Sequence, residues 1–587
     1  MPIDYPSRAS SLNYLGLALS YKYVETGRMC DIQEAISCLQ ISLHQSSTDN
    51  FTRIVAGRIL LHAYVRIQDW QQAYDASSTA VHFTSKLTAR SLNASDKQHM
   101  LAKVVGLASD AAAAALHAGK GPLNALALLE EGRGILATSL EDMRIEVGDL
   151  QDKHPDLAMQ FARLREELDQ PINRNVFTAE ETSNSWQAQA SQRYKRGTEL
   201  DALILKIRQQ SGFENFLLPP NEGDMRAAAG FGPIVVINVS PLRCDAIIIE
   251  PQQIRLLPLP GLSFEAIAEK VKESNLGCPR ILEWLWDAFA SAILDSLGFK
   301  QPPGDDDWPH IWWIPTGVLT KFPLHAAGYH STGSKKAVMD RVMSSYSSSI
   351  KAIIHGRRRN NPEVLSTSSK GKALLVSMQN TPGCGQLPCA ADEVAVVQHL
   401  CESMGIKTIK PEPRKSEIIQ HLPESRLFHF AGHGYTDHID PSESHLALAD
   451  WQSNPLTVGS LLEINLRQQS PFLAYLSACG TGGIRDQKFM DENVHLISAC
   501  QLAGFRHVIG TLWDVNDSIC VDMAKITYEV MMVGGMSDKS LCLGLHEASR
   551  ELRNRWLNDG PRRDATLCES SEEMITARWA PYVHYGI

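Results

Sequence analysis

The sequence predicts an α-helical N-terminal region followed by an α/β region, an overall class of α + α/β. Helical periodicity with many small alanines runs from about residue 9 to 140, which is typical of packed helical pairs. From residue 233 onward the pattern changes to short apolar runs, separated by turn residues and helical segments. Strands that alternate with helices favour a mostly parallel sheet.

The first region, residues 1–140, has the spacing of helical repeats. Packed positions of a tetratricopeptide (TPR) unit are matched by Leu60, Leu61, Tyr64, Ala73 and Ala80. Other units are more degenerate and none carries the full consensus, so an irregular helical bundle is the alternative. Because each repeat buries its face only against neighbours, two or three units need further support. We therefore expect these helices to dock on the following domain.

Residues 141–211 are charged and helical, and we interpret them as a connector of long, exposed helices with a solvated face. The region beyond it should contain the sheet, with a helix over 281–297. The expected strands are 233–239, 244–249, 254–259, 310–315, 373–378, 427–431 and 472–477. The basic and Ser/Pro-rich stretch from 355 to 372 predicts a loop or linker.

Two motifs place a histidine and a cysteine at the ends of predicted strands. They read Leu427-Phe-His-Phe-Ala-Gly-His433-Gly434 and Leu473-Ala-Tyr-Leu-Ser-Ala-Cys479-Gly480. Parallel strands present functional groups beyond their carboxyl ends, which is where His433 and Cys479 fall. A cysteine attacks as the thiolate, and a neighbouring imidazole both favours the thiolate and protonates the leaving amine. The pair therefore predicts a thiol peptidase.

Glycines beside both residues bring the backbone close to a substrate. We expect the amides of Gly434 and Cys479 to form the oxyanion hole, and a backbone carbonyl to be able to orient His433. The alternative is that Cys479 is simply a small core residue, as cysteines often are. His429, inside the apolar run, is expected to be a hydrogen-bonded core or supporting histidine.

A zinc site is disfavoured. A zincin needs H-E-x-x-H on a helix, whereas Phe430 follows His429 and glycines surround His433. Cys384 and Cys389 have no second cysteine pair to complete a site. We expect no metal and no organic cofactor.

These motifs resemble the CHAT domain, a caspase-like and separase-related cysteine peptidase module that occurs with TPR repeats. The matching blocks are 429–434, 442–448, 476–481, 491–496 and 503–514, with further blocks at 312–317, 323–328 and 344–346 and a last one at 579–582. The resemblance implies a caspase-like three-layer sandwich, with a non-catalytic, pseudo-caspase-like half at 212–360 and a catalytic half at 361–587. It places the catalytic dyad on His433 and Cys479, 46 residues apart, close to the roughly 50 of caspases.

The resemblance also implies a binding pocket. In separases a segment similar to Leu512-Trp-Asp-Val-Asn-Asp517 supplies an acidic residue that receives a basic P1 side chain. Asp514 is therefore the first substrate-binding candidate and Asp517 the second, although either aspartate can instead cap the next helix. Asp491 is a candidate for capping or shaping the loop over the cleft. An acidic pocket would also allow the chain to cut itself at 357–359.

Composition sets wider limits. A chain of 587 residues is too long for one core and predicts three or four structural units. Its net charge of −10 gives no basic excess for nucleic acid. Twelve cysteines without repeating spacing favour a reducing compartment. With no signal peptide and no apolar run of membrane length, we expect a cytoplasmic protein that binds neither membrane nor nucleic acid.

These observations lead to one principal expectation and two alternatives. The first is an intracellular caspase-like cysteine endopeptidase that cleaves protein or peptide substrates through a thioester acyl-enzyme. Its TPR-like repeats would bind a protein regulator or target. The second is a catalytically silent TPR–CHAT adaptor or scaffold, and the third is another thiol enzyme such as an acyltransferase or amidase.

Overall fold

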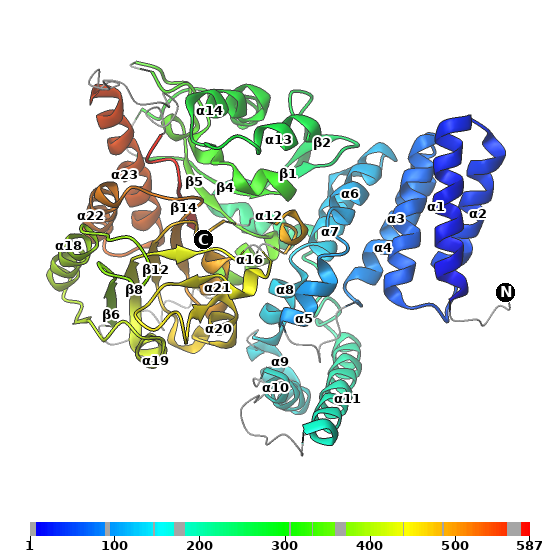
Figure 1. Ribbon diagram of the computed structural model, residues 1–587, viewed down its shortest axis with the longest axis horizontal. Helices are drawn as coiled ribbons and strands as arrows, with labels where there is room; N and C mark the ends of the chain where they lie inside the picture. Colours follow the sequence, from blue (N-terminus) through cyan, green and yellow to red (C-terminus); the bar gives the residue numbers. More distant parts are fainter. Residues whose placement is uncertain are drawn as a thin grey trace. The chain divides into compact units, whose positions relative to one another are not determined.

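The structure is a computed structural model, and the chain divides into two compact units, Met1–Glu222 and Gly223–Ile587. The first is helical and the second is built on a large sheet (Figure 1). The predicted α + α/β class is therefore confirmed. The structure describes residues 7–87, 94–144, 147–169, 182–304, 307–331, 333–358, 371–437, 439–483, 486–492, 494–559 and 577–587.

Successive helices of the first unit pack as pairs: α1 with α2, α3 with α4, and α6 with α7. Their bounds are α1 Arg8–Thr26, α2 Met29–His44, α3 Asn50–Arg66, α4 Trp70–Thr84, α5 Ala94–Leu101, α6 Leu107–His117, α7 Gly121–Gly132 and α8 Ile135–Met143. All five residues singled out by the repeat spacing are buried. A Cβ on Gly57 would lie 2.5 Å from the Cβ of Ala80, so small residues are what permit the close approach of α3 and α4.

Residues beyond α8 form a helical layer with a core of its own. The helices are α9 Gly148–Lys153, α10 Pro155–Asp169 and α11 Thr182–Arg208. Phe161 on α10 packs with Leu200 and Ile207 on α11, and all three are buried. The charges lie outside this core, as in the ion pair of Arg196 and Glu167 at 2.8 Å. The expected connector is helical, but it encloses an apolar core instead of consisting of exposed helices alone.

An 11-stranded sheet organises the second unit, in the order β3-β2-β1-β4-β5-β14-β13-β12-β8-β6-β7. The strands of its first part are β1 Ile234–Val239, β2 Cys244–Ile249, β3 Ile254–Pro258, β4 His310–Pro315 and β5 Met343–Tyr346. Those of its second part are β6 Lys372–Ser377, β7 Thr408–Ile409, β8 Ser425–Ala431, β12 Leu473–Ser477 and β13 His507–Thr511. Each of the seven predicted strands is present to within two residues at either end.

The last strand, β14 (Tyr582–Tyr585), lies in the middle of this sheet. It is antiparallel to β13 and meets β5 in parallel through the single register pair Tyr585 and Tyr346. Strands β6, β8, β12 and β13 are parallel to one another. The C-terminal end of the chain thus joins two groups of strands into one continuous sheet.

Helices cover both faces of the sheet, which gives the predicted three layers. On one side lie α18 (Ala390–Ser403), α22 (Asp517–Val533) and α23 (Asp538–Asp559), and on the other α20 (Val458–Glu463) and α21 (Leu496–Ala503) (Figure 1). The buried strands are apolar nearly throughout, as β12 is, because parallel strands packed on both faces meet no water.

The predicted loop at 355–372 is wrong in its first part. Residues Ile350–Arg358 form helix α16, because Ile350, Ile353 and Ile354 bury one apolar face. The guanidinium of Arg357 lies 4.3 Å from the ring centroid of Trp312. Arg357 thus lies in the last turn of a helix and not in a loop. Arg359 and the rest of the predicted linker up to 370 lie outside the described residues.

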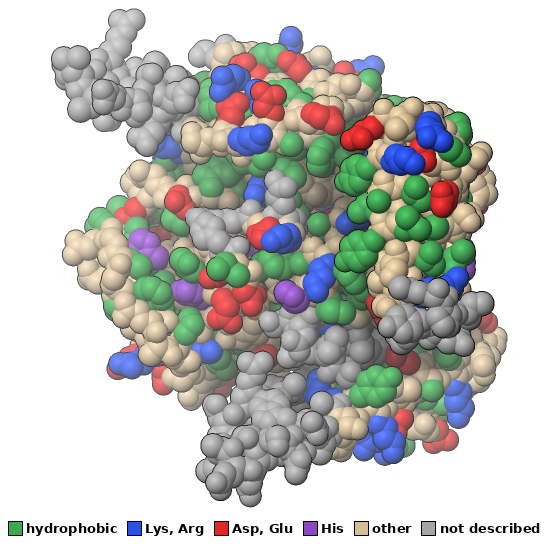
Figure 2. All heavy atoms as spheres, turned by 45° about the vertical axis from the view of Figure 1, so that its right-hand side comes forward, with side chains coloured by type: hydrophobic (Ala, Val, Ile, Leu, Met, Phe, Trp, Pro, Cys, Tyr) green, Lys and Arg blue, Asp and Glu red, His purple; other side chains and the backbone are tan. Residues whose placement is uncertain are grey.

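Four further helices lie beside the first group of strands: α12 Glu222–Ala228, α13 Phe264–Lys270, α14 Pro279–Leu285 and α15 Ser291–Ser296. Helix α19, Lys415–His421, precedes β8. Acidic and basic side chains are interspersed over the face drawn in Figure 2. Over the part of the chain that the structure describes, no helix combines the length and the apolar character needed to span a bilayer.

Candidate active site

His433 and Cys479 occupy equivalent positions on adjacent parallel strands. Ala431 at the end of β8 is paired with Ser477 at the end of β12, and each reactive residue follows its strand end by two positions. Neighbouring strands lie roughly 4.8 Å apart, so the two loops leave the sheet side by side. A Cβ on Gly434 would lie 2.5 Å from the carbonyl oxygen of Cys479, which requires glycine at this contact.

The imidazole of His433 is oriented by a backbone carbonyl. Its Nε2 lies 2.8 Å from the oxygen of Gly385. A carbonyl only accepts hydrogen bonds, so Nε2 carries the proton and Nδ1 keeps the lone pair in the neutral ring. Gly385 lies between β6 and α18, and β6 is the strand next to β8. The sequence carried no signal for this residue, because a backbone acceptor has no side-chain signature.

The thiol of Cys479 is half-buried and faces an acidic neighbour. Burial raises its pKa, a backbone hydrogen bond from Val515 opposes this rise, and the charge and hydrogen bond of Asp514 raise the pKa further. At neutral pH the thiol is therefore protonated in this arrangement. A cation that pairs with the Asp514 carboxylate would remove this effect and favour the thiolate.

Two threonines fix the loop that carries the cysteine. The Thr511 hydroxyl donates to the Ala478 carbonyl at 2.7 Å, and the Thr511 amide donates to the Thr481 hydroxyl at 2.8 Å. Gly480 adopts φ +64°, a conformation that favours glycine and turns the chain directly after Cys479. Both threonines are buried, so the cysteine loop is tied to the end of β13.

A cavity of about 550 Å³ opens beside the thiol. Cys479, Gly434 and Asp514 are among its lining residues. Residues from the first half of the second unit, among them Asn275 and Thr320, also line it. The rest of the lining is Glu273, Ser274, Leu276, Lys321, Tyr435, Thr436, Gly480, Gly482, Gly483, Leu512 and Trp513. The nucleophile candidate and the first binding candidate thus share one cavity.

The other two acidic candidates lie elsewhere. Asp491 is buried and is not among the described residues that line the cavity. Asp517 also lies outside this lining, and its Oδ2 accepts a hydrogen bond from the Cys389 amide at 2.7 Å. The cap of α22 is Asn516, whose side chain accepts from the Ser518 amide. The structure therefore brings Asp514 to the thiol and gives Asp517 a different contact.

The direction of the Gly434 amide follows from the hydrogen bonds between its segment and the paired strand. The Ala447 amide donates to the His433 carbonyl at 2.9 Å, and Leu446 is paired with Gly434. Hydrogen-bonded and non-bonded pairs alternate in an antiparallel ladder, so Gly434 occupies a non-bonded position. Its N–H consequently points away from the strand that holds Leu446.

His429 is enclosed in a buried polar network. Its Nε2 lies 3.1 Å from Glu393 Oε1 and its Nδ1 lies 3.2 Å from the Tyr528 hydroxyl. Glu393 also accepts from the Ser477 hydroxyl at 3.0 Å. His429 is therefore a hydrogen-bonded core residue, as predicted, and it supports the ends of the two strands that carry the candidate dyad.

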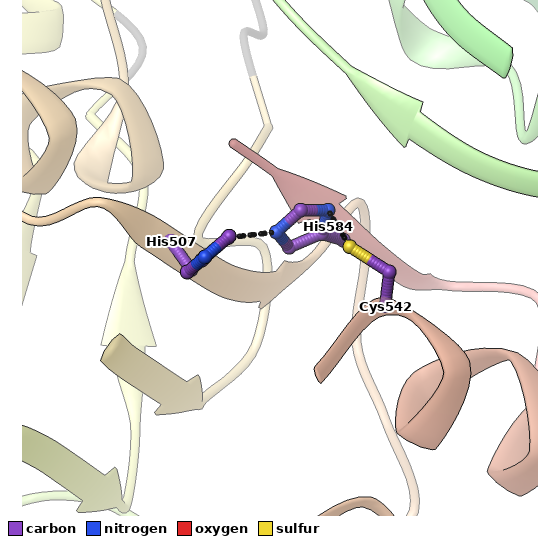
Figure 3. Close-up of side chains that lie close together, drawn as sticks. All are labelled: His507, Cys542 and His584. Carbon is purple, nitrogen blue, oxygen red and sulfur yellow. Dashed lines mark hydrogen bonds between the residues drawn. The ribbon is translucent and has the colours of Figure 1, made fainter. Parts of the chain in front are cut away.

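A second group of polar side chains crosses the sheet away from the cavity. His507, Cys542 and His584 are buried close together (Figure 3). Nε2 of His584 lies 3.0 Å from His507 Nδ1, whereas its Nδ1 lies 3.7 Å from Cys542 Sγ and 2.6 Å from Ser345 Oγ. Because the two nitrogens of His584 face different neighbours, the ring lies between the other groups. This arrangement fits a hydrogen-bonded row better than a shared metal centre.

Comparison with known proteins identifies the family. The model of the CHAT domain matches residues 279–587, which include the whole of the sheet from β4 onward and the His433–Cys479 pair. The chain belongs to the CHAT domain family, as its motifs predicted. The comparison with curated proteins returned no match.

Three solved structures match this chain with low TM-scores and low identity. Two structures of the Saccharomyces cerevisiae separase–securin complex match with a TM-score of 0.40 and 11% identity. They cover 95% and 98% of this chain and 51% and 52% of the matched chain, respectively. A complex of the Porphyromonas gingivalis RgpB pro- and mature domains matches with a TM-score of 0.31 and 12% identity, over 55% of this chain and 71% of that one. The chain thus spans about half the length of the separase chains it matches.

Proposed function

We propose that the protein is a cysteine endopeptidase whose nucleophile is Cys479 and whose acid and base is His433. The observation that carries this proposal is the register of β8 and β12, which puts both residues two positions beyond paired strand ends. Family membership in the CHAT group supports it. The reaction needs no metal or organic cofactor.

The chemistry follows from the two side chains. The Cys479 thiolate attacks the carbonyl carbon of the scissile bond, and the developing oxyanion is stabilised by the amides of Gly434 and Cys479. Protonated His433 then gives its Nδ1 proton to the leaving amine, which departs and leaves a thioester on Cys479. Water activated by the same nitrogen hydrolyses the thioester and regenerates the thiol.

Asp514 is the proposed determinant of substrate choice. Its carboxylate lines the cavity with Cys479 and contacts the thiol. A basic P1 side chain would form an ion pair with it in a partly buried site, where charge pairing discriminates strongly against neutral side chains. The same ion pair would withdraw the carboxylate from the thiol and ease its ionisation.

The first unit is proposed to bind a protein that regulates or targets the peptidase. Its paired helices support TPR-like repeats over residues 1–140, followed by the helical connector at 141–211. The halves at 212–360 and 361–587 would be the non-catalytic and catalytic parts of the CHAT region. A cytoplasmic setting suits a peptidase with a free thiol nucleophile.

The alternative of a silent adaptor is favoured by one observation, the half-buried position of the Cys479 thiol beside the carboxylate of Asp514. Burial and Asp514 both raise the thiol pKa, so the resting pair lacks the thiolate. A positional peptide library incubated with full-length protein and with the Cys479→Ala variant separates the two functions. Cleavage by wild type alone supports the peptidase. Absence of cleavage across the library, together with equal partner binding by both proteins, supports the adaptor.

A further inference from the structure

The loop that orients His433 runs from β6 to α18, residues 378–389, and its two ends are close together. The Met378 amide donates to the Ala431 carbonyl at 2.8 Å, so the loop leaves the sheet beside the strand that carries His433. The Leu387 amide donates to the Gln379 carbonyl at 3.0 Å. Gly385 therefore lies near the turn of a closed loop, and its carbonyl position depends on how that loop is held.

The loop is anchored at one end by the N-terminus of α18. Cys389 is the N-cap of this helix and its own side chain caps nothing. The first amides of a helix need acceptors from outside the helix, and here Asp517 Oδ2 accepts from the Cys389 amide at 2.7 Å. A carboxylate in this position is favoured both by its charge and by the helix dipole. Cys389 lies four residues after Gly385.

Asp517 is not the N-cap of its own helix. Asn516 caps α22 through its side chain, and α22 packs against α18 along the same face of the sheet. The carboxylate of Asp517 therefore bridges the starts of two neighbouring helices. Asp517 is thus linked to His433 in three steps. It accepts from the Cys389 amide, the backbone runs four residues back to Gly385, and the Gly385 carbonyl accepts from His433 Nε2.

A second hydrogen bond anchors the loop on the other side of Gly385. The indole N–H of Trp451 donates to the Pro382 carbonyl at 2.9 Å. Trp451 stacks on His445 with ring centroids 5.3 Å apart, and His445 is paired with Tyr435, next to Gly434. The loop is thus held on both sides of the carbonyl, by an uncharged donor on one side and by a charged acceptor on the other.

We propose that Asp517 is a positioning residue for His433, acting through the backbone of the loop at 378–389 and outside the substrate pocket. This inference rests on the proposed function of the His433–Cys479 pair. Without the carboxylate, the loop is held on one side of Gly385 only, so the Gly385 carbonyl orients the imidazole less precisely. We expect the resulting misplacement of the imidazole to lower activity by up to about 100-fold.

The test compares Asp517→Ala, Asp517→Asn and Asp517→Glu with wild type in the full chain. The matched control is Asp522→Asn, one turn further along α22, whose partner is Arg555. The rate of Cys479 alkylation by iodoacetamide is followed from pH 5 to 10 through the mass of the peptide that carries Cys479. This readout needs no peptide cleavage, so it remains informative even if the proposed peptidase activity is absent.

We expect Asp517→Ala to slow Cys479 alkylation at neutral pH about tenfold and to move its pH profile toward higher pH, because the thiolate loses an oriented imidazole. Asp517→Glu should restore most of the wild-type profile and Asp522→Asn should leave it unchanged. In a His433→Ala background, Asp517→Ala should add no further change, since the effect passes through that ring.

Three results would overturn the proposal. The first is an alkylation profile of Asp517→Ala that superimposes on wild type while only the melting temperature falls, which means that Asp517 merely stabilises α18. The second is an unchanged alkylation profile with an altered P1 preference, which means that Asp517 contacts substrate. The third is an equal effect of Asp517→Ala in the wild-type and His433→Ala backgrounds.

Discussion

Ala431 and Ser477 are register partners at the ends of two parallel strands, and this pairing brings His433 and Cys479 to the same edge of the sheet. The strands on either side continue the pattern. β6 leads into the loop with Gly385 and β13 leads into Asp514. Four adjacent parallel strands thus each deliver one component of the candidate site at their carboxyl ends, where open α/β sheets place their functional groups.

The dyad itself gives the first prediction. Cys479→Ala and His433→Ala should each lower the rate of peptide cleavage by about a thousandfold or more, because nucleophile and base act as a unit. The double variant should be no worse than either single one. Initial rates on the best library peptide measure this, with Cys30→Ser, at an exposed cysteine of the first unit, as control. Equal rates for wild type and Cys479→Ala would remove Cys479 from the mechanism.

Asp514→Asn should change both the thiol and the substrate preference. Removing the carboxylate charge removes a cause of the raised pKa of Cys479, so alkylation of the thiol should shift toward lower pH. Cleavage after basic P1 residues should fall about 10- to 100-fold relative to neutral ones. Thiol alkylation against pH and a P1-varied peptide series measure these effects. An unchanged P1 series would exclude Asp514 from the pocket, and Asp522→Asn is the control for loss of an aspartate charge.

Gly434→Ala tests the backbone contact beside the nucleophile. The new Cβ would lie 2.5 Å from the Cys479 carbonyl oxygen, so one of the two loops must move. We expect a fall of about 100-fold in kcat, because the displaced groups include an oxyanion donor. Gly459→Ala is the matched control, since its Cβ would have no neighbour nearer than 3.5 Å. Full activity in Gly434→Ala would mean that the contact has no bearing on catalysis.

A hydrogen-bonded row of histidines, with the half-buried His310 at one end, predicts loss of stability in mild acid. His310 donates to Ser345, Ser345 to His584, and His584 to His507, which donates to Asp538 at 2.8 Å. This directional chain requires neutral imidazoles at His507 and His584, because each of them accepts a hydrogen bond through one ring nitrogen. His310 only donates, and burial is what keeps its ring neutral. Burial lowers the pKa of His310 from 6.5 to about 3 and also lowers the pKa of His507 and His584.

The direction in which stability changes with pH follows from proton binding by the folded and unfolded chains. Between pH 6.5 and about 3 the unfolded chain binds a proton at His310 that the folded chain does not, so stability falls as the pH falls through this window. One histidine contributes a slope of up to about 1.4 kcal/mol per pH unit. His310→Gln should flatten the pH dependence of the melting temperature between pH 7 and 4. His399→Gln, at an exposed position, is the control, and parallel curves for His310→Gln and wild type would contradict the assignment.

Much of the second unit could be predicted from local patterns. Apolar runs such as Leu473–Ser477 are strands because both faces are buried. His433 and Cys479 could be placed at strand ends for the same reason, since a glycine follows each of them directly. The helical first unit also followed from its periodicity. The prediction of a loop at 355–358 is wrong because the apolar spacing from Ile350 onward makes this basic stretch part of α16.

The sequence by itself determined which segments are strands and helices and which two residues are delivered at strand ends, because these depend on neighbours along the chain. Tertiary structure alone decided what surrounds them. The central place of β14, the Gly385 carbonyl on His433 and the contact of Asp517 with Cys389 join segments distant in sequence through backbone groups. Backbone amides and carbonyls are alike in every residue, so their partners become visible only when the sheet order has brought the loops together.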